Sequence, residues 1–294
     1  MKYLLLLLLL PCSVMAQTGW FIPSNRFSSA AINDVCQDKY GYVWVATDFG
    51  LNKFDGYRFT TYLHQANDTT SICGNIAGCL YCDPEGTMWV GTSRGLDSYD
   101  YGTGQFRHYA FPHGYPRVTN ILNLADGRMV VSTSGYHGLY VLEGNKMVDW
   151  NECDTTIHFV NSIFVDPDGR FWQSSFGNNF TMKDRHGLHP MVSTQGSIVD
   201  FAMRGDEMLI VCMNGIHSYR YGQLTVADID MSAVGPEVGF RSVCTDSQGD
   251  IYIGTRGDGL FRLPHDSRRL ERVKTDAEGI DLNTAKYGPS AKTG

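Results

Sequence analysis

The chain has 294 residues, with 24 Lys and Arg against 31 Asp and Glu, and a formal net charge of −7. A mildly acidic chain without a basic run is a poor partner for nucleic acid or for an anionic membrane surface, so neither is expected here. The 32 glycines and 12% aromatic residues favour many short strands joined by tight turns. No long stretch has apolar residues at helical spacing, and few helices are therefore expected.

Residues 1–16 have the features of a cleavable signal peptide. Lys2 supplies a positive start, and Leu4–Leu10 is an apolar run too short to span a bilayer. Val14–Ala16 provides small residues at a cleavage point before Gln17. The alternative of a first buried strand is poor, because consecutive leucines have no alternating face. The sequence therefore predicts an exported, periplasmic protein.

An odd number of cysteines remains after this cleavage, which is a poor basis for a disulfide framework. Cys79 and Cys82 form a CxxC pair with no second pair and no neighbouring histidine pair, so no zinc site is expected from them. We interpret most cysteines as buried thiols on strands.

A degenerate repeat runs through the rest of the chain. Residues 40–57 (YGYVWVATDFGLNKFDGY) return in altered form at 84–100 (PEGTMWVGTSRGLDSYD). Aligning the copies on the glycine that precedes the aromatic strand gives a spacing of 37 to 45 residues. A period near 40 without helices predicts a β-propeller with one four-stranded blade per repeat. The aligned turn positions are Gly41, Gly86, Gly127, Gly169, Asp206 and Gly249.

Three columns of this alignment have a structural interpretation. Three residues before the turn, four of six copies have aspartate, which can accept hydrogen bonds from backbone N–H groups two residues on. Three residues after the turn stands a large residue, such as Trp44 or Trp89, which we assign to the core. Six residues after it stands a small residue, usually Thr or Ser, which we assign to close packing near the central channel.

The repeats predict an all-β propeller over residues 17–275, with six recognisable blades. Their approximate ranges are 32–62, 76–109, 118–150, 160–191, 198–226 and 238–273. The tail 276–294 is irregular where a further blade would begin. We interpret that tail as a frameshift or truncation, and the ring as an incomplete seven-bladed one.

The segments VWVATDFGLNKFDG and MWVGTSRGLDSYD, each preceded by an Asp-x-x-Gly turn, resemble the two-component regulator propeller repeat. The resemblance extends over about 32–273 and is most specific in blades one, two and six. The chain is similar to the opening of the periplasmic sensor region in Bacteroides-type hybrid histidine kinases. Such sensors carry two seven-bladed propellers, a β-sandwich, one membrane helix, a kinase, a receiver and a DNA-binding domain.

The resemblance implies a sensor that binds a glycan fragment or another small periplasmic ligand. It also implies homodimerisation and partners in the downstream propeller, β-sandwich and kinase domains of a membrane-anchored parent. This chain has six blades and no kinase region, so it is not expected to be an enzyme by itself.

No catalytic set, cofactor site or metal site is expected from the residue pattern. Most repeated carboxylates fall in turn columns instead of converging on one cleft. The Asp166-Pro-Asp168-Gly169 turn lacks the remaining ligands of a calcium loop. The nine histidines are scattered, without the short spacing of paired metal ligands.

Sugar recognition combines aromatic platforms with planar polar groups, and these are sought outside the core columns. For each such residue, the alternative is an ordinary solvated loop side chain. The candidate ligand-binding residues are Arg94, Tyr115, Arg117, Tyr136, His137 and Arg256.

The leading hypothesis is a periplasmic input region of a hybrid histidine kinase that responds to an oligosaccharide. The alternative is a stand-alone exported propeller that acts as a binding or scaffold protein. A propeller enzyme such as a lyase or glycosidase is disfavoured by the lack of a converging catalytic set.

Overall fold

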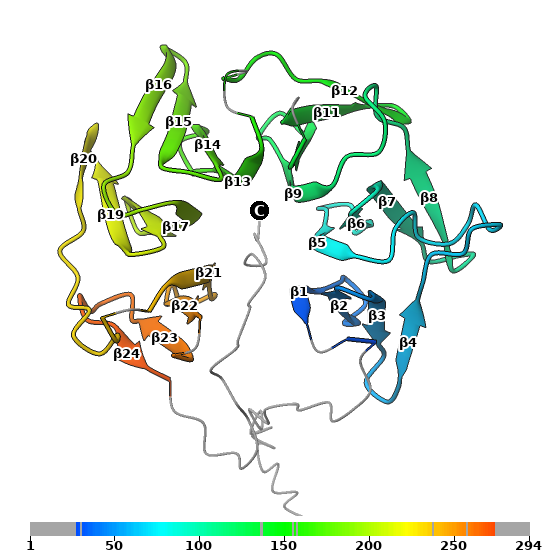
Figure 1. Cartoon of the computed structure of the whole chain (residues 1–294), viewed down its shortest axis with the longest axis horizontal. Coiled ribbons are helices and arrows are strands. Elements are labelled where there is room, and N and C mark those ends of the chain that lie inside the picture. The colour runs from blue at the N-terminus through cyan, green and yellow to red at the C-terminus, as the bar shows by residue number, and fades with distance from the viewer. Residues whose placement is uncertain are drawn as a thin grey trace, which may run out of the picture.

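The chain folds into a β-propeller in which six four-stranded antiparallel sheets are arranged radially around a centre (Figure 1). This computed structural model describes residues 28–29, 31–135, 138–154, 156, 158–236, 238–256 and 258–273. Within those ranges every regular element is a strand. The predicted fold class, all-β with six blades, is confirmed.

The first three blades follow one another in chain order. Blade 1 contains β1 (Ile32–Gln37), β2 (Val43–Thr47), β3 (Gly50–Phe54) and β4 (Phe59–Tyr62). Blade 2 contains β5 (Ala77–Cys82), β6 (Met88–Thr92), β7 (Gly95–Asp100) and β8 (Gln105–Tyr109). Blade 3 contains β9 (Val118–Asn123), β10 (Met129–Thr133), β11 (Leu139–Glu143) and β12 (Lys146–Asp149).

The last three blades repeat the same order. Blade 4 contains β13 (Val160–Val165), β14 (Phe171–Ser175), β15 (Asn179–Asp184) and β16 (Gly187–Val192). Blade 5 contains β17 (Ile198–Arg204), β18 (Glu207–Cys212), β19 (Gly215–Arg220) and β20 (Gln223–Val226). Blade 6 contains β21 (Phe240–Thr245), β22 (Ile251–Thr255), β23 (Leu260–Leu263) and β24 (Glu271–Arg272).

The first strand of each blade lies toward the centre and the fourth lies outside (Figure 1). Because successive strands are antiparallel, their connections alternate between the two ends of the ring. We call one end the turn rim; it holds the turns between first and second strands and between third and fourth strands. We call the other end the entry rim; it holds the turns between second and third strands and the connections between blades.

The aspartate column closes the first turn of its blade and also holds the large aromatic residue. Asp38 accepts hydrogen bonds from the backbone N–H of Tyr40 at 2.9 Å and from Trp44 Nε1 at 2.7 Å. The same indole-to-carboxylate bond joins Trp89 to Asp83 and Trp172 to Asp166, each at 2.8 Å. The carboxylate thus satisfies the indole N–H that burial would otherwise leave without a partner.

The small-residue column has a more specific role than close packing. Thr47 Oγ1 donates to the carbonyl of Gly50 at 2.8 Å and accepts from the N–H of Phe49 at 3.2 Å. Thr92 makes the same pair of bonds with Gly95 and Arg94. The hydroxyl therefore closes the turn between the second and third strands and fixes the backbone of the entry rim.

Blade 5 departs from the sequence alignment by one residue. In β17 and β18, Arg204 pairs with Glu207, so a two-residue turn replaces the longer Asp-x-x-Gly turn. Ala202 therefore lies opposite Leu209, whereas the turn length of blade 1, in which Cys36 lies opposite Trp44, would bring Phe201 opposite Leu209. The glycine-anchored alignment was wrong for this strand because it assumed a constant turn length.

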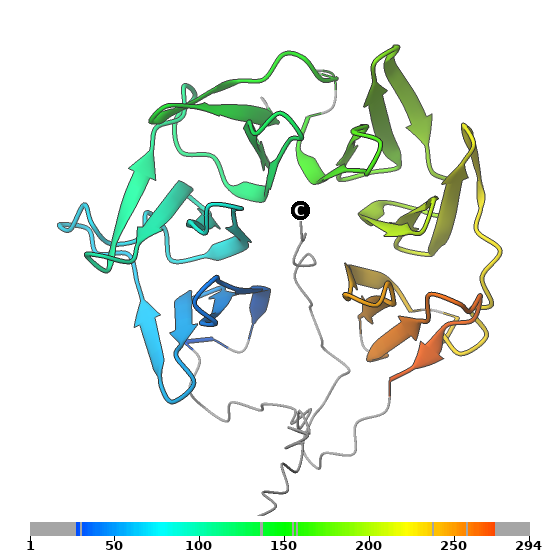
Figure 2. The ribbon, with the colours of Figure 1, turned by 180° about the vertical axis from the view of Figure 1, so that it is seen from behind.

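Apolar clusters fill the space between successive blades. They join blades 1 and 2, 2 and 3, 3 and 4, 4 and 5, and 5 and 6. Six blades thus have five such interfaces in the described part of the chain. Figures 1 and 2 show from both sides that the described strands leave the ring open between blade 6 and blade 1.

The two faces at this opening expose positions that are buried everywhere else. Val35 is 43% exposed, whereas Leu80, its counterpart in blade 2, is 7% exposed. Tyr252 of blade 6 is half-buried, whereas Trp44 at the equivalent position of blade 1 is fully buried against blade 2. A seventh blade would cover both, and the incomplete seven-bladed ring stays a prediction.

The predicted signal peptide and the tail from residue 274 lie outside the described residues. Among the described residues, no helix is long and apolar enough to cross a membrane.

Candidate functional site: the entry rim

Four of the six predicted ligand-binding residues lie on the entry rim. Arg94 is in the turn between β6 and β7, and Arg256 directly follows β22. Tyr115 and Arg117 are in the connection that leads from β8 into β9. The side chains of all four are exposed. Tyr136 and His137 lie outside the described residues.

The structure brings Arg94 and Tyr115 together although they come from different segments. The guanidinium carbon of Arg94 lies 5.8 Å from the centre of the Tyr115 ring, within the range of a cation–π contact. Tyr115 itself is 78% exposed. Gly74 packs against the base of the Arg94 side chain, because a Cβ there would lie 3.3 Å from the Cβ of Arg94. Arg94 is therefore held between the chain that enters blade 2 and the exposed ring of Tyr115.

The arginines of the entry rim differ from most others in their charge partners. Arg128, Arg170 and Arg262 each form an ion pair with a carboxylate on or near the turn rim. Within the described residues, Arg94 and Arg256 form no ion pair, and neither does Arg117. Their guanidinium groups thus remain able to bind an external acceptor such as a hydroxyl or carboxylate oxygen.

Sequence reasoning missed three exposed aromatic residues on the same rim. Phe49 and Phe176 lie in the turns between second and third strands of blades 1 and 4, and Phe159 immediately precedes β13. The repeat itself contained the signal for two of them. Phe49 occupies the alignment position of Arg94, and Phe176 that of Arg256.

Phe159 is also held in an unusual backbone conformation. Its φ of 54° is in the left-handed region, which a bulky side chain rarely adopts. Its N–H donates to the carbonyl of Gly135 at 3.3 Å, which ties it to the second-to-third-strand turn of blade 3. Such strain is commonest where a side chain is positioned for binding.

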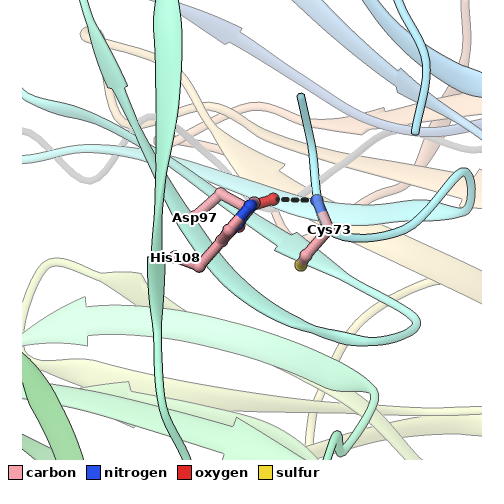
Figure 3. Close-up of side chains that lie close together, drawn as sticks. All are labelled: Cys73, Asp97 and His108. Carbon is pink, nitrogen blue, oxygen red and sulfur yellow. Dashed lines mark hydrogen bonds and ion pairs between the residues drawn. The ribbon is translucent and has the colours of Figure 1, made fainter. Parts of the chain in front are cut away.

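A second cluster lies where the chain enters blade 2 (Figure 3). Asp97 of β7 is fully buried; its Oδ2 accepts from the N–H of Cys73 at 2.8 Å and its Oδ1 lies 2.6 Å from His108 Nδ1 of β8. One ligand atom from each of these three residues lies within 4.8 Å of the others. Cys73 and Asp97 are 24 positions apart in the sequence, and Asp97 and His108 are 11 positions apart. These separations form no motif, so this cluster could not be predicted from the sequence.

The cysteines of the described residues are free thiols that are poor nucleophiles. Burial raises the pKa of Cys36 to about 12 and that of Cys244 to about 11. Since the thiolate is the nucleophilic form, these side chains stay unreactive at neutral pH. The repeated aspartates are likewise engaged in the turns described above.

A separate polar cavity of about 270 Å³ lies on the outer edge of blades 1 and 2. It is lined by β4, the connection 63–72 and the start of β8, including Thr61, Asp68 and Phe106. This volume of about 270 Å³ is just below the usual range of about 300 to 1,000 Å³ for ligand pockets, and its two aromatic lining residues, Tyr62 and Phe106, are half-buried and buried. The entry rim is the better candidate.

The profile of the two-component regulator propeller family matches residues 26–49 and 71–94. Both segments include an entry into a blade, the Asp-x-x-Gly turn and the aromatic strand after it. These two segments of the first two blades are therefore similar to two-component regulator propeller repeats.

One curated relative is Histidine kinase P4 of Formosa agariphila, which is 46% identical over 52 residues. That match covers 18% of this chain and 4% of the kinase. Among solved structures, the extracellular domain of a hybrid two-component system from B. thetaiotaomicron superposes with a TM-score of 0.71 at 22% identity. It covers 89% of this chain and 37% of that domain, so this chain spans well under half of its relative.

The same fold is found in an enzyme. Virginiamycin B lyase from Staphylococcus aureus superposes with a TM-score of 0.67 at 13% identity, over 84% of this chain and 85% of the lyase. The identities to both structures are low, so these superpositions establish the fold and not the activity.

Proposed function

We propose that this chain is the periplasmic ligand-sensing region of a hybrid two-component histidine kinase, and that it responds to an oligosaccharide. The observation that carries the proposal is the pair of family repeats at 26–49 and 71–94, together with the 46% identity of a 52-residue segment to a histidine kinase. The chain supplies binding, and phosphoryl transfer belongs to the kinase part of the parent protein.

The entry rim is the proposed ligand site. Exposed aromatic rings at Phe49, Tyr115 and Phe176 offer flat apolar faces for sugar rings. Arg94 and Arg117 offer hydrogen-bond donors that no carboxylate of the described residues engages. Flat rings beside free planar donors suit a ligand that is apolar on its ring faces and polar at its edges.

The proposed mechanism is a shift of population. A ligand that binds one arrangement of the rim more tightly than another favours that arrangement, and the bias passes to the downstream domains. In the parent protein these are the second propeller, the β-sandwich and a dimeric, membrane-anchored kinase. Residues 1–16 act as the export signal in this proposal.

The experiment is a thermal-shift screen of residues 17–294 against neutral and acidic oligosaccharides. A ligand that binds the folded state raises Tm progressively as its concentration increases, and at 100 times its Kd the added stability is about 2.7 kcal/mol. The proposal expects at least one oligosaccharide to act in this way without being consumed. If the screen instead finds cleavage of a substrate, an enzyme is the correct interpretation.

The alternative remains a stand-alone exported binding or scaffold protein. It shares the ligand site, and the two hypotheses differ in the gene sequence downstream of the codon for residue 294. That nucleotide sequence distinguishes the two hypotheses. A reading frame that continues into a membrane helix and a kinase supports the sensor hypothesis. A frame that encodes no further repeats and no kinase contradicts it.

A further inference from the structure

The chain that enters a blade is latched onto the third strand by a repeated set of polar contacts. In blade 1 the N–H of Ser28 donates to Asn52 Oδ1 at 3.3 Å, and Thr61 Oγ1 donates to the same oxygen at 2.8 Å. Ser28 Oγ also lies 3.1 Å from Thr47 Oγ1. These contacts fix the entering chain to β3 and β4 before the blade begins.

Blade 2 has the same latch, built from different residues. The N–H of Cys73 donates to Asp97 Oδ2 at 2.8 Å, His108 Nδ1 lies 2.6 Å from Asp97 Oδ1, and Cys73 Sγ lies 3.1 Å from Thr92 Oγ1. Cys73, Asp97 and His108 therefore stand where blade 1 has Ser28, Asn52 and Thr61. The latch geometry itself requires none of these three residue types, since neutral side chains achieve it in blade 1.

All three substitutions in blade 2 introduce side chains that bind transition metals. A thiolate, an imidazole and a carboxylate together form a ligand set that suits Zn²⁺. Tetrahedral Zn²⁺ holds such donors roughly 3.3 to 3.8 Å apart, from bonds of about 2.0 to 2.3 Å. Since the three donors already lie within 4.8 Å of one another, a shift of about 1 Å suffices to bring them onto one ion.

The surroundings also fit a three-ligand site with an open fourth position. Asp97 is fully buried, whereas the side chain of His108 is 37% exposed, so the cluster is reached from solvent on one side. Figure 3 shows the three side chains converging from β7, β8 and the entering chain. Water can complete the coordination from the exposed side.

We propose that Cys73, Asp97 and His108 form a Zn²⁺ site that fixes the entry into blade 2. Binding displaces the proton that lies between Asp97 and His108 Nδ1, which passes to solvent or to His108 Nε2, and it displaces the thiol proton of Cys73, which passes to solvent. Gly74, which packs against Arg94, directly follows this site. The metal thus stabilises the part of the entry rim that holds the Arg94–Tyr115 pair.

The test uses blade 1 as a template for the control protein. The triple variant Cys73→Ser, Asp97→Asn, His108→Thr gives blade 2 the latch residues of blade 1. After chelation, untagged wild type and the triple variant are titrated with ZnCl₂ by calorimetry, and their melting is followed with and without the metal. We expect one Zn²⁺ per chain with a Kd in the micromolar range or below and a metal-dependent rise in Tm for wild type only.

Two further proteins keep the test decisive if the triple variant does not fold. The single variant Cys73→Ser retains the latch and removes the thiolate, and Cys82→Ser removes another half-buried thiol of blade 2. With Co²⁺ as the probe, the thiolate-to-metal absorption band is expected in wild type and Cys82→Ser and lost in Cys73→Ser. Absence of stoichiometric Zn²⁺ binding to wild type overturns the proposal, as does equal binding by Cys73→Ser.

Discussion

At the scale of single residues, the repeated aspartate positions are explained by the hydrogen bonds that their side chains accept. Asp38 accepts four of them, from the backbone of Tyr40 and Tyr42, from the Trp44 indole and from the Tyr101 hydroxyl of blade 2. Where blade 3 has Leu124 in place of the aspartate, it also has Val130 in place of the tryptophan. The carboxylate and the indole occur together because each satisfies the other's polar group.

The first prediction concerns this carboxylate. Asp38→Ala leaves a buried indole N–H and the hydroxyl of the half-buried Tyr101 without this acceptor, and we expect the free energy of unfolding to fall by roughly 3 kcal/mol. The control is Asp126→Ala, which removes an exposed turn aspartate of blade 3 and is expected to cost about 0.5 kcal/mol. Urea unfolding of both variants gives the comparison, and equal losses would refute the assignment.

The second prediction concerns acid stability. Asp250 is buried in blade 6 and accepts from the His265 N–H at 2.8 Å and from Arg262 Nε at 2.7 Å. The backbone hydrogen bond from His265, followed by the side-chain bond from Arg262, lowers the pKa of Asp250 from 3.8 to about 2. A depressed pKa in the folded state adds stability that is complete above pH 3.8 and is lost as the pH falls toward 2.

We therefore expect Asp250→Asn to be less stable than wild type at pH 6 and to approach wild type in stability below about pH 3. Chemical unfolding at several pH values between 6 and 2 measures this difference. A gap in stability that stays constant across that range would show that the charge of Asp250 has no part in it.

At the scale of elements, the stabilising unit is the interface between two blades. Each first strand turns one apolar residue toward the preceding blade, and in blades 2 to 6 that residue is buried. The third prediction follows from the exception in blade 1. Leu80→Ala is expected to cost about 3 kcal/mol of unfolding free energy.

Its matched variant, Val35→Ala, is expected to cost less than about 1 kcal/mol, because Val35 faces the opening of the ring and is 43% exposed. Thermal melting of the two variants at the same concentration is sufficient. A loss for Val35→Ala as large as that for Leu80→Ala would mean that another segment covers this face in solution.

The sequence was sufficient to predict these elements wherever the repeat kept its turn length. Gly41 and Gly86 have positive φ values of 83° and 84°, so the turn glycine was a reliable marker in blades 1 and 2. It failed in blade 5, where Gly205 and Asp206 form a shorter turn and shift the first strand by one residue. Turn length is decided by local pairing, which a fixed spacing does not record.

The candidate sites were only partly predictable. Arg94 and Arg256 could be identified from the repeat, because the alignment places them in the turn after the second strand. The proximity of Tyr115 to Arg94, and of His108 to Cys73, depends on how a connection folds back on its blade. Such contacts between separate segments cannot be predicted from the spacing of the sequence repeat.

At the scale of the whole molecule, the described blades form an arc with two uncovered sheet faces. Blades pack face to face, so the surface at the opening consists of side chains such as Val35 and Tyr252. The fourth prediction is that residues 17–294 alone are marginally stable and associate as concentration rises. Analytical ultracentrifugation with thermal melting tests this, and a sharp melt from a monomer at all concentrations would show that six blades suffice.

The proposed sensor function depends above all on which end of the ring binds the ligand. Tyr115 lies on the entry rim and Tyr57 on the turn rim, and both rings are exposed, at 78% and 89%. Each is replaced by Ala, and the oligosaccharide found by screening is titrated calorimetrically into both variants and wild type. We expect Tyr115→Ala to weaken binding at least about tenfold, equivalent to 1.4 kcal/mol, and Tyr57→Ala to bind as wild type does. Full affinity in Tyr115→Ala together with a loss in Tyr57→Ala would contradict the placement of the site on the entry rim.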